Sequence, residues 1–212
     1  MLSLDRLLSR PNLTIEERLM IMAKAAIWPG DWKLLAECLE RAQSRKLNRD
    51  RFAETFLQAI LFYGFPRVVS AFGIMKETWP NEQSPEGNTI DSDQAAKAGR
   101  RLFDEIYGKN SSSVHRLLAS YHAELHGFVL EAAYGRILSR PGLDPRVREL
   151  LACAALVTMG QIPQLIAHAR GAIHFGASPM ELRETLTSAL RSEVRIEDLL
   201  RRALPSSNLG DS

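Results

Sequence analysis

The chain has 212 residues, of which 45% are hydrophobic and 25% charged, with 13 Gly and 10 Pro. These values are typical of a folded globular protein with an ordinary core, and they exclude a disordered, collagen-like or low-complexity chain. Twenty-seven Lys and Arg against 25 Asp and Glu leave a formal charge of +2, too small for the basic surface of a nucleic-acid-binding protein.

The first ten residues carry Asp5, Arg6 and Arg10 and lack the apolar run of a secretory signal, so no export is expected. Three helices follow. They are predicted over 14–27, 31–45 and 48–62, and they open on Thr, Asp and Asn, residue types that cap helices. The first part of the chain is therefore predicted to be all α.

The middle of the chain contains a polar segment followed by two predicted helices. Residues 78–93 are rich in Pro, Asn, Ser, Gly and acidic side chains without apolar periodicity, which predicts a linker or a long surface loop. A short helix is predicted around residues 102–107. A long helix is predicted over 114–132, with one apolar face that belongs to the core or to an interface: Val114, Leu117, Leu118, Tyr121, Leu125, Phe128, Val129 and Ala132.

The last third again predicts helices. Asp144-Pro145 and Ser178-Pro179 are helix-start signals, and Gly176 is a stop signal. The segment 150–169 has no formal charge, but Gly160 and Pro163 interrupt it. We therefore interpret it as two buried helices joined by a turn and not as a membrane span.

The two helical regions resemble each other. With a shift of 130 residues and no gap, 6–60 matches 136–190 at 14 of 55 positions, which indicates an internal duplication. The predicted organisation is a first, degenerate module at 1–77, a linker or loop at 78–93, a second module with the site at 94–205, and a disordered tail at 206–212.

The sequence resembles the carboxymuconolactone decarboxylase family, whose fold is that of alkyl hydroperoxidase D. The resemblance rests on the runs from Tyr134 to Leu150 and from His168 to Glu184, and on Glu54 followed by Tyr63-Gly64-Phe65-Pro66 in the first copy. It implies an all-α fold built from a duplicated helical module, with the second copy better matched than the first.

Proteins of the fold that this sequence resembles carry out two kinds of chemistry. Thiol peroxidases of this fold use a CxxC with a Glu and a His; here the Glu falls on Glu149 and the His on His168, but the two Cys positions hold Gln161 and Gln164. Without a thiolate at those positions, a thiol peroxidase or disulfide reductase is not expected. In the first copy the four positions hold Leu19, Asp31, Leu34 and Cys38, which predicts a scaffold copy.

The other chemistry implied is decarboxylation without a cofactor. An unsaturated lactone can itself take up the electron pair that CO2 leaves behind, so the protein need only bind the carboxylate and move a proton. The resemblance assigns Glu149 and His168 as catalytic residues, and Arg140, Arg148, Gln161 and Gln164 as substrate-binding residues. The Glu149 and His168 side chains are expected within hydrogen-bond reach of each other or of one shared water or ligand, facing a cavity at a module or subunit interface. The substrate is expected to be a small carboxylated lactone or related acid, in the breakdown of aromatic compounds.

Three alternatives remain open. The protein is a lyase of this type, a non-catalytic oligomeric or ligand-binding member of the fold, or an enzyme of another reaction. The segment from His122 to His126 is not HExxH, so no metal site is predicted. The only cysteines, Cys38 and Cys153, are not expected to pair, which fits a reducing cytoplasm.

An assembly is also implied. Single-module relatives form rings, so a fused pair is expected to form a homotrimer with pseudo-sixfold symmetry. Neither a membrane nor a nucleic acid is expected as a partner.

Overall fold

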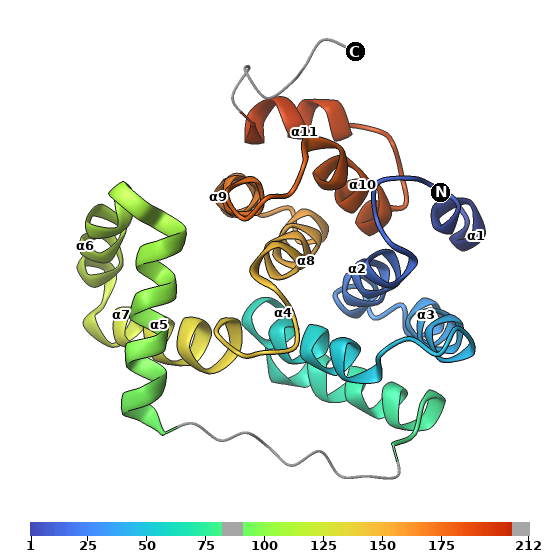
Figure 1. The fold of residues 1–212 in the computed structure, drawn as a ribbon, viewed down its shortest axis with the longest axis horizontal. Coiled ribbons are helices and arrows are strands. Elements are labelled where there is room, and N and C mark those ends of the chain that lie inside the picture. The colour runs from blue at the N-terminus through green and yellow to red at the C-terminus, as the bar shows by residue number, and fades with distance from the viewer. Residues whose placement is uncertain (82–90, 205–212) are drawn as a thin grey trace. The chain divides into compact units, whose positions relative to one another are not determined.

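The computed structural model describes residues 1–81 and 91–204, and the described residues are entirely helical where they are regular (Figure 1). The predicted all-α class is confirmed. The chain divides into two compact units: unit 1 comprises residues 1–81 and 144–212, and unit 2 comprises residues 82–143. This division differs from the two predicted modules, which were defined by sequence similarity and stay predictions. The predicted tail at 206–212 and most of the predicted loop at 78–93 lie outside the described residues.

The first helices of unit 1 begin where the sequence predicts. After α1 (Leu4–Leu8), the helix α2 (Ile15–Ile27) starts with a capping box, in which Thr14 accepts from the Glu17 N–H and Glu17 accepts from the Thr14 N–H. The helix α3 (Trp32–Ser44) is capped by Asp31. These caps satisfy backbone donors that the first helical turn leaves free.

The helix α4 (Arg49–Thr78) is longer than predicted but breaks near the predicted end at residue 62. Gly64 has a φ of 71°, a left-handed conformation that glycine adopts without strain, and Pro66 follows in the next turn. By length and composition alone, α4 is apolar enough to cross a membrane. The break divides it into two segments, each shorter than the roughly 20 residues that a span needs.

The C-terminal part of unit 1 repeats this pattern. The helices α8 (Pro145–Thr158) and α10 (Pro179–Leu190) start at the predicted positions, α9 (Ile162–His174) lies between them, and α10 has a capping box. The segment 150–169 is two helices joined by a turn, as predicted, but the first turn of α9 is exposed at Pro163 and Gln164 and not buried. The last helix, α11 (Ile196–Ala203), packs on α9 and α10.

In unit 1, helices from the two ends of the chain pack against one another. Helices α2 and α8 pack against each other; α10 contacts both, and so does α4 (Figure 1). Helices α3 and α9 have the same length and bounds displaced by 130 residues, and α4 and α10 start at the same displacement. A common origin of the two copies stays a prediction.

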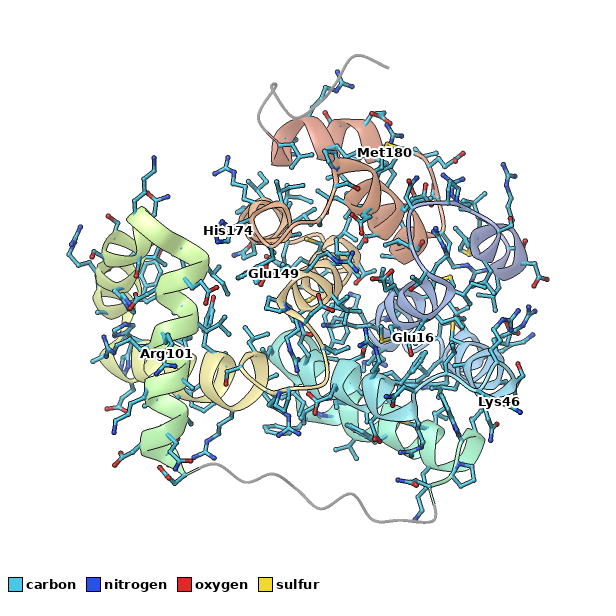
Figure 2. The ribbon with its side chains drawn as sticks, in the orientation of Figure 1. Glu16, Lys46, Arg101, Glu149, His174 and Met180 are labelled. Atoms are coloured by element: carbon cyan, nitrogen blue, oxygen red, sulfur yellow. The ribbon has the colours of Figure 1, made fainter. Side chains whose placement is uncertain are left out.

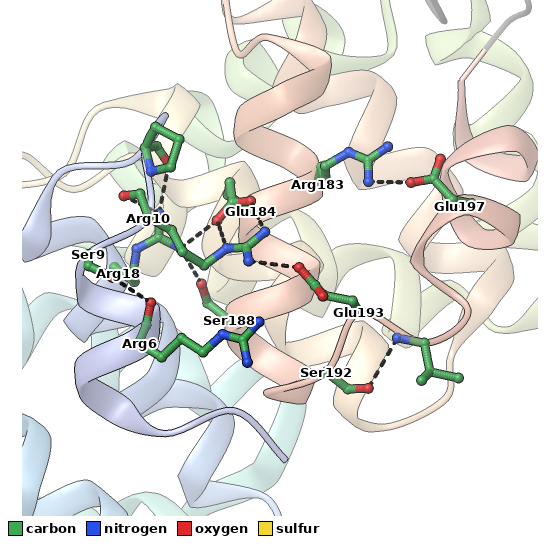
Figure 3. A network of polar contacts seen from close by, with 12 residues as sticks. Arg6, Ser9, Arg10, Arg18, Arg183, Glu184, Ser188, Ser192, Glu193 and Glu197 are labelled. Atoms are coloured by element: carbon green, nitrogen blue, oxygen red, sulfur yellow. Dashed lines mark hydrogen bonds and ion pairs between the residues drawn. The ribbon is translucent and has the colours of Figure 1, made fainter. Parts of the chain in front are cut away.

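Buried ion pairs join the two halves of unit 1, which are the segment from α1 to α4 and the segment from α8 to α11. Arg10 donates from Nε and Nη2 to the two oxygens of Glu184, at 2.8 and 2.7 Å (Figure 3). Arg18 donates to the same carboxylate at 2.9 Å and to the Ser188 hydroxyl at 2.8 Å. Burial alone would raise the pKa of Glu184, but these hydrogen bonds outweigh it and hold the pKa below its ordinary value.

The same contact occurs once more at an offset of 130 residues. Arg148 donates to Glu54 at 3.0 Å, as Arg18 does to Glu184. The first pair joins α2 to α10, and the second joins α8 to α4. These arginines therefore hold the two halves of unit 1 together.

Unit 2 consists of α5 (Ser92–Tyr107), a short 3₁₀ turn (Gly108–Asn110), α6 (Ser111–Tyr121), α7 (Ala123–Phe128) and a π-helical segment (Val129–Leu138). The single long helix predicted over 114–132 is wrong. His122 is extended, and its side chain accepts from the Glu124 N–H, so that it ends α6 and caps α7. The apolar periodicity continues across this break, which is why the pattern suggested one helix.

Candidate functional site

The two residues predicted to be catalytic, Glu149 on α8 and His168 on α9, are in direct contact. Nδ1 of His168 lies 2.8 Å from Oε2 of Glu149. The Glu149 side chain, labelled in Figure 2, is only 3% exposed, whereas the His168 side chain is 18% exposed. The predicted contact is therefore present, and the catalytic roles stay a prediction.

A glycine allows this contact. Gly171 follows His168 by about one turn of α9, and a Cβ at this position would lie 2.6 Å from Oε2 of Glu149. No side chain fits at that distance without displacing the carboxylate. The absence of a side chain at Gly171 therefore leaves room for the Glu149 carboxylate against α9.

The contact fixes the function of each imidazole nitrogen. Because Nδ1 faces the carboxylate, it is the nitrogen that carries a proton when His168 is neutral, and Nε2 is then an acceptor. When the ring is protonated, Nε2 becomes a donor. The pair can therefore take up and return a proton at Nε2, while Glu149 orients the ring.

Aromatic side chains of α4 complete the surroundings. The Phe62 ring lies edge-on to His168, with 6.3 Å between centroids, and Tyr63 stacks on Trp28 at 5.8 Å. The Tyr63 hydroxyl is 3.3 Å from the hydroxyl of Thr158. Burial raises the pKa of Tyr63, so its hydroxyl keeps its proton at neutral pH.

One cavity of unit 1, of about 240 Å³, lies near these aromatic residues. Its wall includes Trp28, Thr158, Ser188 and Arg191 but neither Glu149 nor His168. A cavity shared by the predicted catalytic pair therefore stays a prediction.

The predicted substrate-binding residues are placed differently from one another. Gln161 is the N-cap residue of α9 and Gln164 lies in its first turn, and both residues are exposed. Arg148 is buried and engaged with Glu54, so its guanidinium serves the ion pair between the halves. Arg140 belongs to unit 2, where it follows the π-helical segment.

The corresponding positions of the first half hold no such pair. Leu19 and Cys38, which occupy the places of Glu149 and His168, are both fully buried. Asp31 caps α3, and Leu34 lies in the core. These positions serve folding in the structure.

Both cysteines are buried free thiols. Burial raises the pKa of Cys38 to about 12 and that of Cys153 well above its ordinary value. Neither thiol forms a thiolate at neutral pH, and the thiolate is the reactive form.

We therefore expect the protein to be inert in thiol chemistry. A thiol-specific reagent such as dithionitrobenzoate should label neither cysteine of the folded protein and both after unfolding. Hydrogen peroxide with a dithiol should be consumed at the background rate. Peroxide reduction above background that is lost in Cys153→Ser would contradict this prediction.

The histidines of unit 2 form a chain of contacts. His115 lies 2.8 Å from His126 through ring nitrogens and 3.0 Å from Oδ1 of Asp104, while His122 caps α7. Over residues 1–81 and 91–204, no cluster of three or more His, Cys, Asp or Glu has the geometry to hold a metal ion.

Comparison with known proteins agrees with the resemblance of the motifs. The model of the carboxymuconolactone decarboxylase family matches residues 124–191, which include Glu149 and His168. The chain is 36% identical over 98 residues to a nitrosuccinic acid decarboxylase of Metarhizium robertsii, covering 42% of this chain and 68% of the relative. It is 28% identical to a 4-carboxymuconolactone decarboxylase of Acinetobacter baylyi, covering 46% and 73%. It is 29% identical to peroxisomal protein 2 of Schizosaccharomyces pombe, covering 66% and 67%.

The chain belongs to the carboxymuconolactone decarboxylase family. The family match lies in the half that carries the Glu149–His168 pair.

Sequence reasoning missed two residues that lie next to this pair. Lys24 is a single charged residue in the apolar run from Leu19 to Ile27, and it is fully buried. Gly171 is a glycine in the interior of a helix, a position that glycine disfavours unless space is required. Both were visible in the sequence as exceptions to their local pattern.

Proposed function

We propose that the protein is a cofactor-free decarboxylase that removes CO2 from a small carboxylated lactone or a related acid. The observation that carries the proposal is the 2.8 Å contact between the buried Glu149 carboxylate and the partly exposed His168 ring. Two relatives are named as decarboxylases, one of a carboxylated lactone and one of nitrosuccinic acid.

The reaction needs an electron acceptor within the substrate. When the bond between carbon and carboxylate breaks, CO2 leaves and the electron pair moves through the double bond to the lactone carbonyl oxygen. His168 then returns a proton from Nε2 to carbon, and Glu149 stabilises the ring in its protonated form. A nitro group can accept the electron pair in the same way as the carbonyl.

Binding of the substrate is assigned to residues near the ring. Gln164 lies one turn before His168 on α9, so the two side chains emerge on the same face, and Gln161 lies at the start of the helix. We propose these amides as hydrogen-bond donors to the substrate. Arg148 is kept as a proposed carboxylate ligand, which requires that it leave Glu54.

The test is turnover by matched variants. Carboxymuconolactone and nitrosuccinic acid are supplied to the full-length protein, and CO2 release is measured. His168→Ala is expected to lose about 100-fold or more in turnover, because a positioned proton donor contributes about 10² to 10⁴ in rate. Glu149→Gln, which keeps the size of the side chain, is expected to lose less.

The control is His174→Ala, which removes an exposed histidine from the end of the same helix. It should retain the activity of the unmodified protein, and all variants should keep the same oligomeric state. Equal turnover in the unmodified protein and His168→Ala would remove His168 from the mechanism.

A non-catalytic, ligand-binding role is the second candidate. It is favoured by the first half, where Leu19 and Cys38 replace the pair and are fully buried. In that case the acids should raise the melting temperature without release of CO2.

We further propose a homotrimer. Four large apolar side chains of unit 2 are between 44% and 69% exposed, namely Leu117, Tyr121, Leu125 and Phe128, and contact between chains would cover them. Light scattering should give three times the chain mass of 23.7 kDa. A monomer in dilute solution would contradict this assembly.

For the cellular location we propose the cytoplasm. Fungal relatives are named peroxisomal proteins, so the peroxisome is the alternative that a localisation experiment should compare. The aromatic-compound pathway expected from the motifs is proposed on the same basis as the substrate.

A further inference from the structure

Lys24 is a buried amine without a hydrogen-bond partner. It lies in the middle of α2, its side chain is 0% exposed, and no described residue accepts a hydrogen bond from Nζ. Nζ lies 4.6 Å from the centroid of the Phe62 ring. Buried lysines are normally paired, because an amine without a partner in the interior is costly, so this one requires an explanation.

The surroundings of Lys24 favour the neutral amine. Burial lowers its pKa well below the ordinary value, and the nearby Arg148 guanidinium lowers it further, whereas Glu149 and Cys153 oppose the shift. Burial away from water and a neighbouring cation are the two conditions that activate a lysine as a nucleophile. A lowered pKa increases the fraction of the amine whose lone pair is free to attack.

Lys24 also adjoins the proposed active site. The Phe62 ring contacts Nζ of Lys24 and lies against the ring of His168, which in turn contacts Glu149. The Lys24 amine and the His168 imidazole thus contact one aromatic side chain, and the Glu149 carboxylate contacts the imidazole. They come from α2, α9 and α8.

Phe62 is the side chain that covers the amine. It is half-buried, and it lies two residues before the break of α4 at Gly64. A substrate that reaches Nζ must take the place of this ring. Nζ thus lies under the Phe62 ring and near the buried Arg148, Glu149 and Cys153 of α8.

We propose that Lys24 forms an imine with a small 3-oxo acid, so that the site also decarboxylates acids whose carbonyl lies next to the carbon bearing the carboxylate. This inference rests on the proposed function, since it uses the same pair for proton transfer. It extends the substrate class from acids with a conjugated acceptor to acids with a ketone, because the imine supplies a better acceptor than the ketone itself.

The reaction begins with formation of the imine. Nζ attacks the carbonyl carbon and a C–N bond forms; the carbonyl oxygen takes one proton from Nζ and one from the solvent and leaves as water, so that an iminium remains. The bond to the carboxylate then breaks, CO2 leaves, and the electron pair moves to the iminium nitrogen to give an enamine. His168 returns a proton to carbon, and water adds to the imine and releases the ketone and the free amine.

The experiment traps the imine. The full-length protein is incubated at neutral pH with acetoacetate and sodium cyanoborohydride, which reduces an imine to a stable secondary amine, and the modified lysine is located by mass spectrometry. The chain offers its own controls: its five other lysines, Lys33, Lys46, Lys76, Lys97 and Lys109, are all exposed. We expect modification at Lys24 to exceed that at each exposed lysine by at least tenfold.

Two substitutions and one control variant test the role of Lys24. Lys24→Met should abolish the preferential label and acetoacetate decarboxylation together, whereas Lys33→Met should retain both. Phe62→Ala should increase the rate of labelling at Lys24. Equal labelling of all six lysines, or no label at Lys24, would overturn the proposal.

The outcome is separable from that of the proposed function. Trapping reports the amine directly and does not depend on turnover of the lactone or of nitrosuccinic acid. If those acids are not turned over and Lys24 is still trapped, the imine chemistry stands and the lactone chemistry fails. If they are turned over and Lys24 is not trapped, the reverse holds.

Discussion

Replacement of Glu184 by alanine is expected to destabilise the protein by about 3–5 kcal/mol, because it leaves the buried charge of Arg18 without a charged partner. Arg18 has a side-chain exposure of 0% and shares the Glu184 carboxylate with Arg10. Burial lowers the pKa of Arg18, and Glu184 opposes that shift. The loss is measured as the free energy of unfolding in urea.

The matched control is Glu193→Ala. Glu193 also pairs with Arg10, at 2.7 Å, but its side chain is 56% exposed, and an exposed pair contributes at most about 1 kcal/mol. Should Glu184→Ala not fold, the double replacement of Arg18 by Met and Glu184 by Leu removes both charges and should recover stability. A loss from Glu184→Ala no larger than that from Glu193→Ala would contradict the prediction.

The contribution of Glu184 also has a defined pH dependence. Its pKa in the folded protein lies below the ordinary value, so its stabilising effect is fully present above the unfolded value, about 4.3, and is lost as the pH falls through the lower folded value. The difference in stability between the unmodified protein and Glu184→Ala should therefore shrink only in acid.

The helices of unit 1 could be predicted because their signals are local. Thr14, Asp144 and Ser178 each accept from a backbone N–H three residues later, and the apolar residues that follow keep a helical period. Such a signal does not depend on the rest of the fold. The break at His122 was missed because the apolar period of residues 114–132 runs through it.

The contact between Glu149 and His168 was predicted from the positions of the family motif. The buried pairs were not, because they join residues far apart in the chain: Arg148 to Glu54, and Arg18 to Glu184. Nothing in the sequence distinguishes an arginine on the surface from one paired in the core. Lys24 interrupts the apolar run from Leu19 to Ile27, but its burial was missed because it results from the packing of α2 against α8 and α4.

The state of Lys24 can be tested by stability alone, without a substrate. Lys24→Met keeps a similar length and removes the amine, so we expect it to be more stable than the unmodified protein at neutral pH, where burial of the amine is costly. Lys33→Met removes an exposed amine from α3 and should change the free energy of unfolding little. Urea unfolding at several pH values measures both.

The pH dependence of this gain has a definite sign. The pKa of Lys24 is lowered well below its ordinary value in the folded protein, while in the unfolded chain it is about 10.4, so in the range between them the unfolded state binds one more proton. Between those two pKa values, the unmodified protein therefore gains stability relative to Lys24→Met by about 1.4 kcal/mol per pH unit as the pH rises. Other titrating groups are present in both proteins and largely cancel in the difference. A difference that stays constant over this range would show that Lys24 keeps its proton in the folded protein, and the neutral nucleophile that imine formation requires would then be absent.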